Sequence, residues 1–136
     1  MKVIVCVDDR MGMLFNKRRQ SKDALVRKDM LELLPPGEKL HVNEYTAGQF
    51  LPEEKDRLQV DADFPETVGE EEYCFVETVK LSPLKNQIRE VVLYRWNRSY
   101  PGDLFLDLDL TEYRLDSVKE FVGNSHPEMV REIYVK

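Results

Sequence analysis

The chain has 136 residues, of which 42% are hydrophobic and 34% charged, and its net charge is −6. This length and composition predict one domain, residues 1–136, with its own core. An acidic chain lacks the broad basic face that duplex nucleic acid requires, which excludes general nucleic-acid binding. With no apolar run long enough to span a membrane and no signal-peptide pattern in MKVIVCVDD, we expect a cytoplasmic protein without a membrane partner.

The first half predicts a β–loop–α–β order. KVIVCVD (2–8) is a continuous apolar run typical of a buried central strand. DRMGMLFNKRRQ (9–20) is a long loop and therefore a candidate functional loop. Ser21 is predicted to open a helix that Pro35-Pro36-Gly37 ends. A short strand over 39–43 and a helical turn over 44–50 follow, whereas residues 52–64 show no clear period.

The second half is richer in β-structure. Strands are predicted over 71–79, 89–98, 113–122 and 131–136, with one helical turn over 83–88. DLFLDLDL (103–110) alternates apolar and acidic residues, which predicts a half-exposed strand. The fold class is therefore α/β: a single-domain mixed sheet with few flanking helices and a three-layer core. Cys6 and Cys74 lie in apolar runs, so we expect two buried thiols and no disulfide.

Charge is distributed unevenly along the chain. Residues 1–28 contain eight basic and three acidic side chains, for a net charge of +5, whereas residues 29–136 carry −11. Most of the positive charge lies in the loop and the start of the helix that follows it. This loop suits one small anion or an acidic group of a partner better than a nucleic-acid duplex.

The chain resembles dihydrofolate reductase at both ends. The opening VIVCVDD, the loop around Met11-Gly12-Met13 and Asp23 match that family's first strand, active-site loop and substrate carboxylate. The closing half is similar to its last strands, with matches at Gly102-Asp103, Phe105, Tyr113, Phe121 and Ile133-Tyr134. The resemblance implies a trimmed dihydrofolate-reductase-like scaffold. It also implies that Asp23 is the catalytic residue, gripping the amino group and ring nitrogen of a pterin, under a loop that covers the site.

The chain also resembles a group of small bacterial proteins that share VIVCVDDR–M–FN–RRQS and YRWNR–YP–D. Some of them carry the label ribonuclease Z. That label requires a His-x-His-x-Asp-His metal motif, and this sequence has only His41 and His126. We therefore reject it on ligand count.

Two departures from the reductase pattern argue against its cofactor. The resemblance implies a Gly-Arg-x-Thr segment that binds NADPH, but here Asn43 and Glu44 replace the Gly and the Arg. An acid in place of a cation repels phosphate. The later Gly-Gly position reads YCFVETVKL, and without glycine the backbone does not approach a pyrophosphate closely. We expect no cofactor.

The basic loop is the first candidate binding site. Arg18, Arg19 and Lys22 supply charge, Asn16 and Gln20 supply hydrogen bonds, and a helix starting at Ser21 would expose free N–H groups. The alternative is a solvated loop that the acidic remainder neutralises. Asp23 likewise has an alternative role, as an acid that complements the helix dipole.

Trp96 and Arg98 form the second candidate. Strand alternation places both on one face with Tyr94, where they would line a pocket for a planar ligand; the alternative is a core face.

Asp8 and Asp9 suit either Mg²⁺ or a turn, and we favour the turn. Neither His41 nor His126 has the sequence neighbours of a metal site or a catalytic triad, so we expect no metal.

Three functions remain open. The first is binding of a small anionic or heterocyclic ligand without nicotinamide chemistry. The second is an enzyme for a pterin-like or nucleotide-like substrate, with Asp23 on the heterocycle and Arg18 and Arg19 on its anionic tail. The third is a protein-interaction module that docks an acidic partner on the basic loop.

Overall fold

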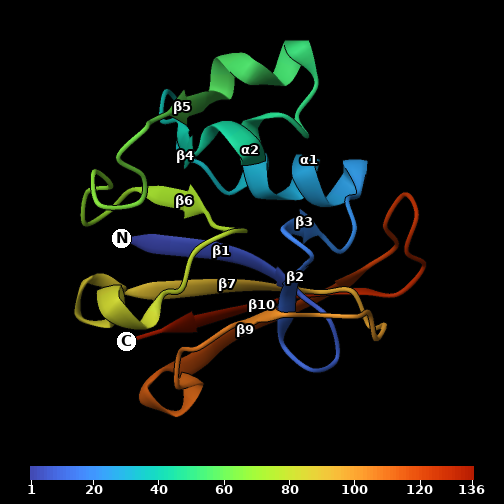
Figure 1. The fold of residues 1–136 in the computed structure, drawn as a ribbon. Helices are drawn as coiled ribbons and strands as arrows, with labels where there is room; N and C mark the ends of the chain where they lie inside the picture. Colours follow the sequence, from blue (N-terminus) through green and yellow to red (C-terminus); the bar gives the residue numbers. More distant parts are fainter.

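A seven-stranded sheet organises the computed structural model, which describes residues 1–136. Its strand order is β5-β4-β6-β1-β7-β10-β9, and β10 runs antiparallel to both of its neighbours. Figure 1 shows this sheet with both termini at the same end. The strands are β1 (Lys2–Val7), β4 (Leu40–Val42), β5 (Leu58–Val60), β6 (Tyr73–Phe75), β7 (Glu90–Arg95), β9 (Arg114–Phe121) and β10 (Met129–Val135).

Strand β1 is central, as its sequence predicts. It pairs in parallel with β6 and β7, so that Ile4 lies between Phe75 and Val92. Its alternate side chains enter two different cores: Ile4 joins one cluster, and Val3 and Val5 join the other. A strand buried on both faces has no polar face, which explains its continuous apolar run.

The two faces of the sheet are covered differently, giving three layers. On one face, helix α1 (Ala24–Glu32) buries Val26 and Met30, and α2 (Glu44–Ala47) adds Ala47. On the other face, no α-helix packs; the cover consists of the 3-10 helix η2 (Ser82–Gln87), the segments 64–68 and 104–113, and strand β2 (Gly12–Phe15). No helix has the length and apolar character needed to cross a membrane. Both cysteines are free thiols, as predicted; Cys74 is buried, whereas Cys6 is only partly buried.

Helix α1 begins later than the sequence predicts. Asp23, not Ser21, is the N-cap: its Oδ1 accepts hydrogen bonds from the backbone N–H of Leu25 (2.9 Å) and Val26 (3.3 Å). Asp and Ser are both strong N-cap residues. The prediction for Ser21 was wrong, since its hydroxyl contacts the distant His126 instead of capping the helix.

The predicted loop 9–20 contains a β-hairpin, and this corrects the sequence interpretation. Strand β2 (Gly12–Phe15) pairs with β3 (Arg18–Arg19) and with β8 (Leu104–Phe105) in a second, three-stranded sheet. The two turn residues, Asn16 and Lys17, have φ values of 51° and 62°. Two left-handed residues between antiparallel strands form a type I′ turn, the geometry that fits the twist of a hairpin.

Lys17 is therefore a position where glycine should stabilise the fold. We expect Lys17→Gly to raise the free energy of unfolding by about 0.5 kcal/mol, because relief of left-handed strain, about 1–2 kcal/mol, exceeds the entropic penalty of glycine. Urea denaturation measures the change. Lys17→Ala is the control, since it removes the charge and keeps the Cβ; an equal gain in both variants would show that charge, not turn geometry, is responsible.

The acidic segment 103–110 also differs from its prediction. Only Leu104–Phe105 forms a strand, and Leu110–Glu112 is a 3-10 helix, η3. The alternation is nevertheless real, since Leu106 and Leu108 pack on the core while Asp107 and Asp109 are exposed. Asp107 accepts hydrogen bonds from the N–H of Leu81 and Ser82 at the start of η2, so this acid caps the 3-10 helix.

Residues 52–64, which show no period, contain the 3-10 helix η1 (Pro52–Arg57) and β5.

Candidate functional site

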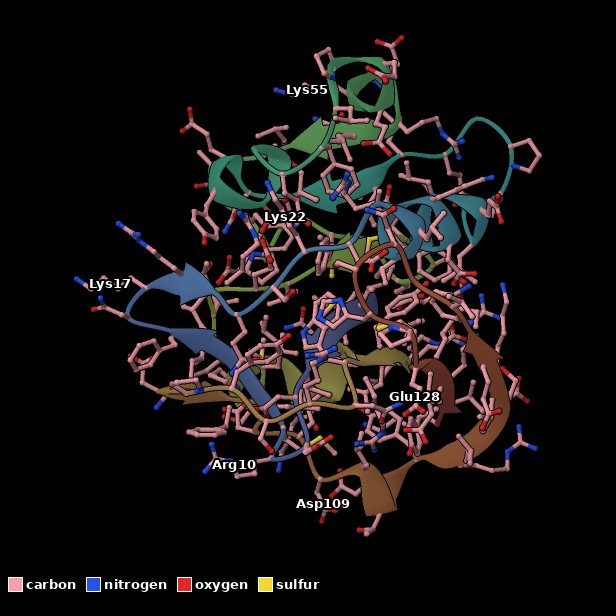
Figure 2. All side chains as sticks on the ribbon, turned by 90° about the vertical axis from the view of Figure 1, so that its right-hand side faces the viewer. Arg10, Lys17, Lys22, Lys55, Asp109 and Glu128 are labelled. Atoms are coloured by element: carbon pink, nitrogen blue, oxygen red, sulfur yellow. The ribbon has the colours of Figure 1, made fainter.

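A hollow of about 310 Å³ lies beside the β2–β3 hairpin. Figure 2 shows Lys17 pointing outward at the tip of this hairpin. Four of the predicted ligand-binding residues line the hollow, whereas Ser21, Lys22, Trp96 and Arg98 do not. The lining residues are Phe15, Asn16, Arg18, Arg19, Gln20, Tyr100 and Pro101.

The two arginines of the hollow are not equivalent. Arg19 donates from Nε (3.0 Å) and an Nη (3.1 Å) to the buried Glu77, and its guanidinium lies 4.3 Å from the centre of the Tyr45 ring. Its charge is therefore neutralised inside the protein. Arg18 is exposed and has no ion pair, so it is the arginine with a guanidinium free for a ligand.

Gln20 is one of the polar residues that line the hollow. Its Nε2 donates to the carbonyl of Pro101 at 3.1 Å, while its Oε1 is buried without a hydrogen-bond partner. One acid lies close by, because the Asn16 N–H donates to Asp103 at 2.9 Å. The hollow thus combines a free cation with the amide side chains of Asn16 and Gln20.

Asp23 is buried, and both of its carboxylate oxygens already accept backbone hydrogen bonds. Besides the two amides of α1, it accepts from the N–H of Asn124 (2.8 Å) and Ser125 (2.7 Å). Burial by itself raises the pKa of Asp23, but these four amides lower it more, so the pKa is well below its usual range. The carboxylate is an N-cap that also anchors residues 123–126. These contacts agree with the alternative role of Asp23, an acid at the start of the helix that stabilises the fold. Its role in binding a ligand stays a prediction.

His126 lies between Asp23 and Tyr100, one of the residues that line the hollow. Its Nδ1 lies 3.4 Å from Asp23 Oδ2, and its Nε2 lies 2.9 Å from the hydroxyl of Tyr100 and 3.1 Å from Ser21 Oγ. The ring is buried and stacks 4.6 Å from Trp96, centre to centre. The sequence analysis did not predict these contacts, because it considered only residues near His126 in the chain. Local spacing gives no signal for it, since Asp23 and His126 are 103 residues apart.

Trp96 and Arg98 do not form a shared face. Trp96 is buried with Tyr94 in the helix-side core, and Arg98 is exposed. Strand β7 ends at Arg95, and Asn97 has a left-handed φ of 54°, which breaks the alternation on which that prediction depended.

Asp8 organises the base of the hairpin. It is buried and accepts from the N–H of Arg10 (2.9 Å), Gly12 (2.7 Å) and Tyr100 (3.0 Å). This agrees with the turn interpretation.

His41 lies between Asp61 (3.4 Å) and Glu72 (3.0 Å), and no group of three or more metal-ligating side chains is arranged to hold a metal ion.

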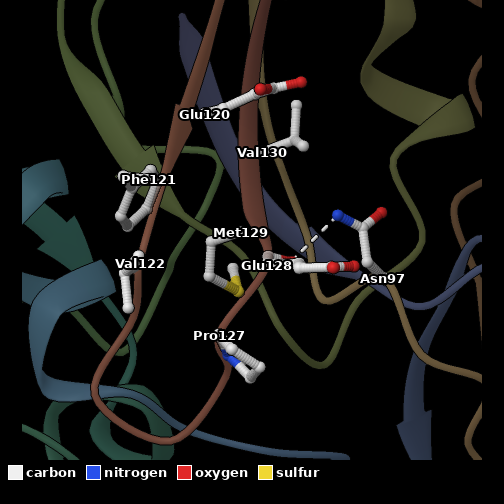
Figure 3. Close-up of a pocket in the computed structure, with 8 residues that line it drawn as sticks. All are labelled: Asn97, Glu120, Phe121, Val122, Pro127, Glu128, Met129 and Val130. Atoms are coloured by element: carbon white, nitrogen blue, oxygen red, sulfur yellow. Dashed lines mark hydrogen bonds between the residues drawn. The ribbon is translucent and has the colours of Figure 1, made fainter.

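A second groove, of about 470 Å³, lies on the β9–β10 hairpin (Figure 3). Asn97 donates to the Glu128 carbonyl at 2.9 Å across its edge. Phe121, Val122 and Met129 provide apolar walls, and Glu120 and Glu128 lie at the rim. None of the predicted site residues lines this groove, and its acidic rim does not favour an anion.

Comparison with models of known protein families and with curated protein sequences gave no match. Among solved structures, the chain is similar to dihydrofolate reductase from Enterococcus faecalis complexed with NADP(H) and RAB-propyl. The TM-score is 0.68 at 12% identity, covering 98% of this chain and 94% of that chain. The fold is therefore that of dihydrofolate reductase, as its resemblance implies.

Proposed function

We propose that this protein binds a small anionic or heterocyclic ligand in the hollow beside the β2–β3 hairpin. The observation that carries this proposal is the unpaired guanidinium of Arg18 in a hollow that also contains Asn16 and Gln20. A guanidinium binds carboxylate or phosphate through two parallel hydrogen bonds. The amide side chains add donors and acceptors that suit a heterocycle.

Two features at the start of α2 argue against binding of the NADP(H) that the enterococcal enzyme carries. Asn43 caps α2 with its own side chain, accepting from the Thr46 N–H at 2.9 Å, and Glu44 occupies the first turn. A carboxylate at that end of the helix repels a phosphate. These features support ligand binding without nicotinamide chemistry.

A thermal-shift screen at low salt tests the proposal, with NADPH, NADH, folate analogues, nucleotides and inorganic phosphate as probes. A ligand at 100 times its Kd stabilises the native state by about 2.7 kcal/mol. We expect phosphate or a nucleotide to raise Tm in the wild type and not in Arg18→Ala. Lys22→Ala is the matched control, because Lys22 is an exposed cation outside the hollow.

Three outcomes would contradict the proposal. Stabilisation by NADPH would restore a reductase as the leading function. Equal loss of stabilisation in Arg18→Ala and Lys22→Ala would indicate unspecific charge attraction. If no probe raises Tm, the protein-interaction alternative is favoured; Phe15, 48% exposed beside Arg18, would then contact an acidic partner.

A further inference from the structure

We propose that Ser21, His126 and Asp23 form a nucleophilic triad that hydrolyses carboxylic esters. Ser21 Oγ lies 3.1 Å from His126 Nε2, and His126 Nδ1 lies 3.4 Å from Asp23 Oδ2. The order is that of a nucleophile, a base and a carboxylate that orients the base. The arrangement is recognised by geometry alone, and no nucleophile motif in the sequence indicates it.

The surroundings of His126 favour the tautomer that a base needs. Nδ1 faces the Asp23 carboxylate and the Ser125 hydroxyl (3.0 Å), whereas Nε2 faces two hydroxyls. A proton on Nδ1 is therefore donated toward Ser125 and Asp23, and the one lone pair of Nε2 accepts from either Ser21 or Tyr100. The amides around Asp23 keep it ionised, and Trp96 packs against the ring and fixes its plane.

Tyr100 is placed to stabilise the developing oxyanion. Its hydroxyl lies 2.9 Å from the same Nε2 that Ser21 contacts. When Ser21 gives its proton to the lone pair of His126 Nε2, this nitrogen becomes a donor and cannot accept from Tyr100. The Tyr100 hydroxyl is then free to donate to the oxygen of the tetrahedral intermediate, which is the function of an oxyanion donor.

The reaction balances with water as the only co-reactant. Ser21 Oγ attacks the acyl carbon as its proton passes to His126 Nε2; the bond to the alcohol oxygen then breaks, and His126 protonates the leaving alkoxide. Water attacks the acyl-serine, gives one proton to His126 and releases the acid, after which the proton returns to Ser21 Oγ. The products are one acid and one alcohol.

The substrate class follows from the neighbouring hollow. Ser21 is partly exposed and follows Gln20, and Gln20 and Tyr100 both line the hollow that contains Arg18. An ester that carries a second, free carboxylate would place this group on Arg18. This preference, unlike the triad itself, rests on the proposed function.

A fluorophosphonate probe tests the triad directly, with intact-mass and peptide mass spectrometry as the readout. We expect one label, on Ser21, that is absent from Ser21→Ala and present in the control Ser99→Ala, because Ser99 is exposed and does not contact His126. Ser21→Ala removes one partly exposed oxygen, and an unchanged Tm verifies that it is folded. An unlabelled wild type, or a label on Ser125, would overturn the proposal.

Ester hydrolysis separates the triad from the ligand site. With 4-nitrophenyl acetate and mono-4-nitrophenyl succinate, we expect Ser21→Ala to lower kcat/KM by about 100-fold or more. Arg18→Ala should lower it for the charged ester only. Loss in Ser21→Ala without any effect of Arg18→Ala would support the triad and contradict the proposed function. Rates in Ser21→Ala equal to the wild type, with phosphate binding intact, would contradict the triad alone.

Discussion

Asp29→Ala is expected to lower the free energy of unfolding by about 3 kcal/mol, one of the two largest effects on stability that we predict. Asp29 is a buried carboxylate on α1 that accepts from the hydroxyl of Tyr94 (2.6 Å), Lys119 Nζ (2.6 Å) and an Nη of Arg131 (2.8 Å). These partners come from β7, β9 and β10, so one side chain joins the helix to three strands.

The magnitude follows from what alanine would leave behind. The Arg131 side chain is only 16% exposed, and its Nε already lacks a partner, so it would become an uncompensated buried charge. Lys119 is 47% exposed and can turn toward water, which keeps the effect at the lower end of the range for buried pairs.

Urea denaturation with two further variants tests this account. Tyr94→Phe removes one hydrogen bond to a charged group and should lower the free energy of unfolding by about 1.5 kcal/mol. Glu32→Ala, an exposed acid on the same helix, should change it by less than about 0.5 kcal/mol. An effect of Asp29→Ala no larger than that of Glu32→Ala would contradict the role of the cluster.

The cluster also predicts a pH dependence. Burial by itself raises the pKa of Asp29, but the hydrogen bonds from Lys119 and Tyr94 and the charge of Arg131 lower it more. A carboxylate with a lowered pKa in the folded state stabilises the protein above its unfolded pKa, about 3.9, and loses this contribution as the pH falls through the folded value. Asp29→Ala should therefore lose less stability than the wild type between pH 5 and pH 2.

Sequence patterns predicted the elements whose signal is local. The strands predicted over 2–8 and 113–122 depend on the residues of one segment, and both lie where they were predicted. In contrast, the alternation in 103–110 indicates which side chains are buried, and not whether the backbone pairs with another strand. It correctly predicted that Leu106 is more buried than Asp107, but not that both residues lie outside any strand.

Predictions that depended on long-range contacts were weaker. Counting charges located the basic segment but did not show that Glu77 neutralises Arg19, because the two residues are 58 positions apart. The hairpin was missed because its turn reads Asn16-Lys17, and lysine is a poor signal for a left-handed position. Asp23, Ser21 and Trp96 were each selected for other reasons, and only the fold shows that they meet at His126.

Asp23→Ala is the second large effect, and we expect it to lower the free energy of unfolding by about 3 kcal/mol. Loss of an N-cap accounts for about 1 kcal/mol. The N–H groups of Asn124 and Ser125 would lose their acceptor as well, and each unsatisfied donor adds about 1 kcal/mol.

Asp109→Ala is the matched control, because Asp109 caps the short η3 and holds no distant loop. It should change the free energy of unfolding by about 1 kcal/mol or less. Amide exchange, measured by NMR, provides a second readout: the N–H of Asn124 and Ser125 should be protected in the wild type and exchange faster in Asp23→Ala. The two measurements together show whether Asp23 only caps helix α1 or also fixes the backbone of residues 123–126 by hydrogen bonds.

The same variant decides whether the Asp23 carboxylate stabilises the fold or serves only to bind a ligand. If the carboxylate served a ligand alone, Asp23→Ala would keep its stability and lose ligand binding, since binding sites are commonly built at a stability penalty. The four backbone amides on Asp23 predict the reverse, a large loss of stability without ligand. They also lower its pKa against the opposing effect of burial, so its contribution should persist at neutral pH and disappear only well below pH 4.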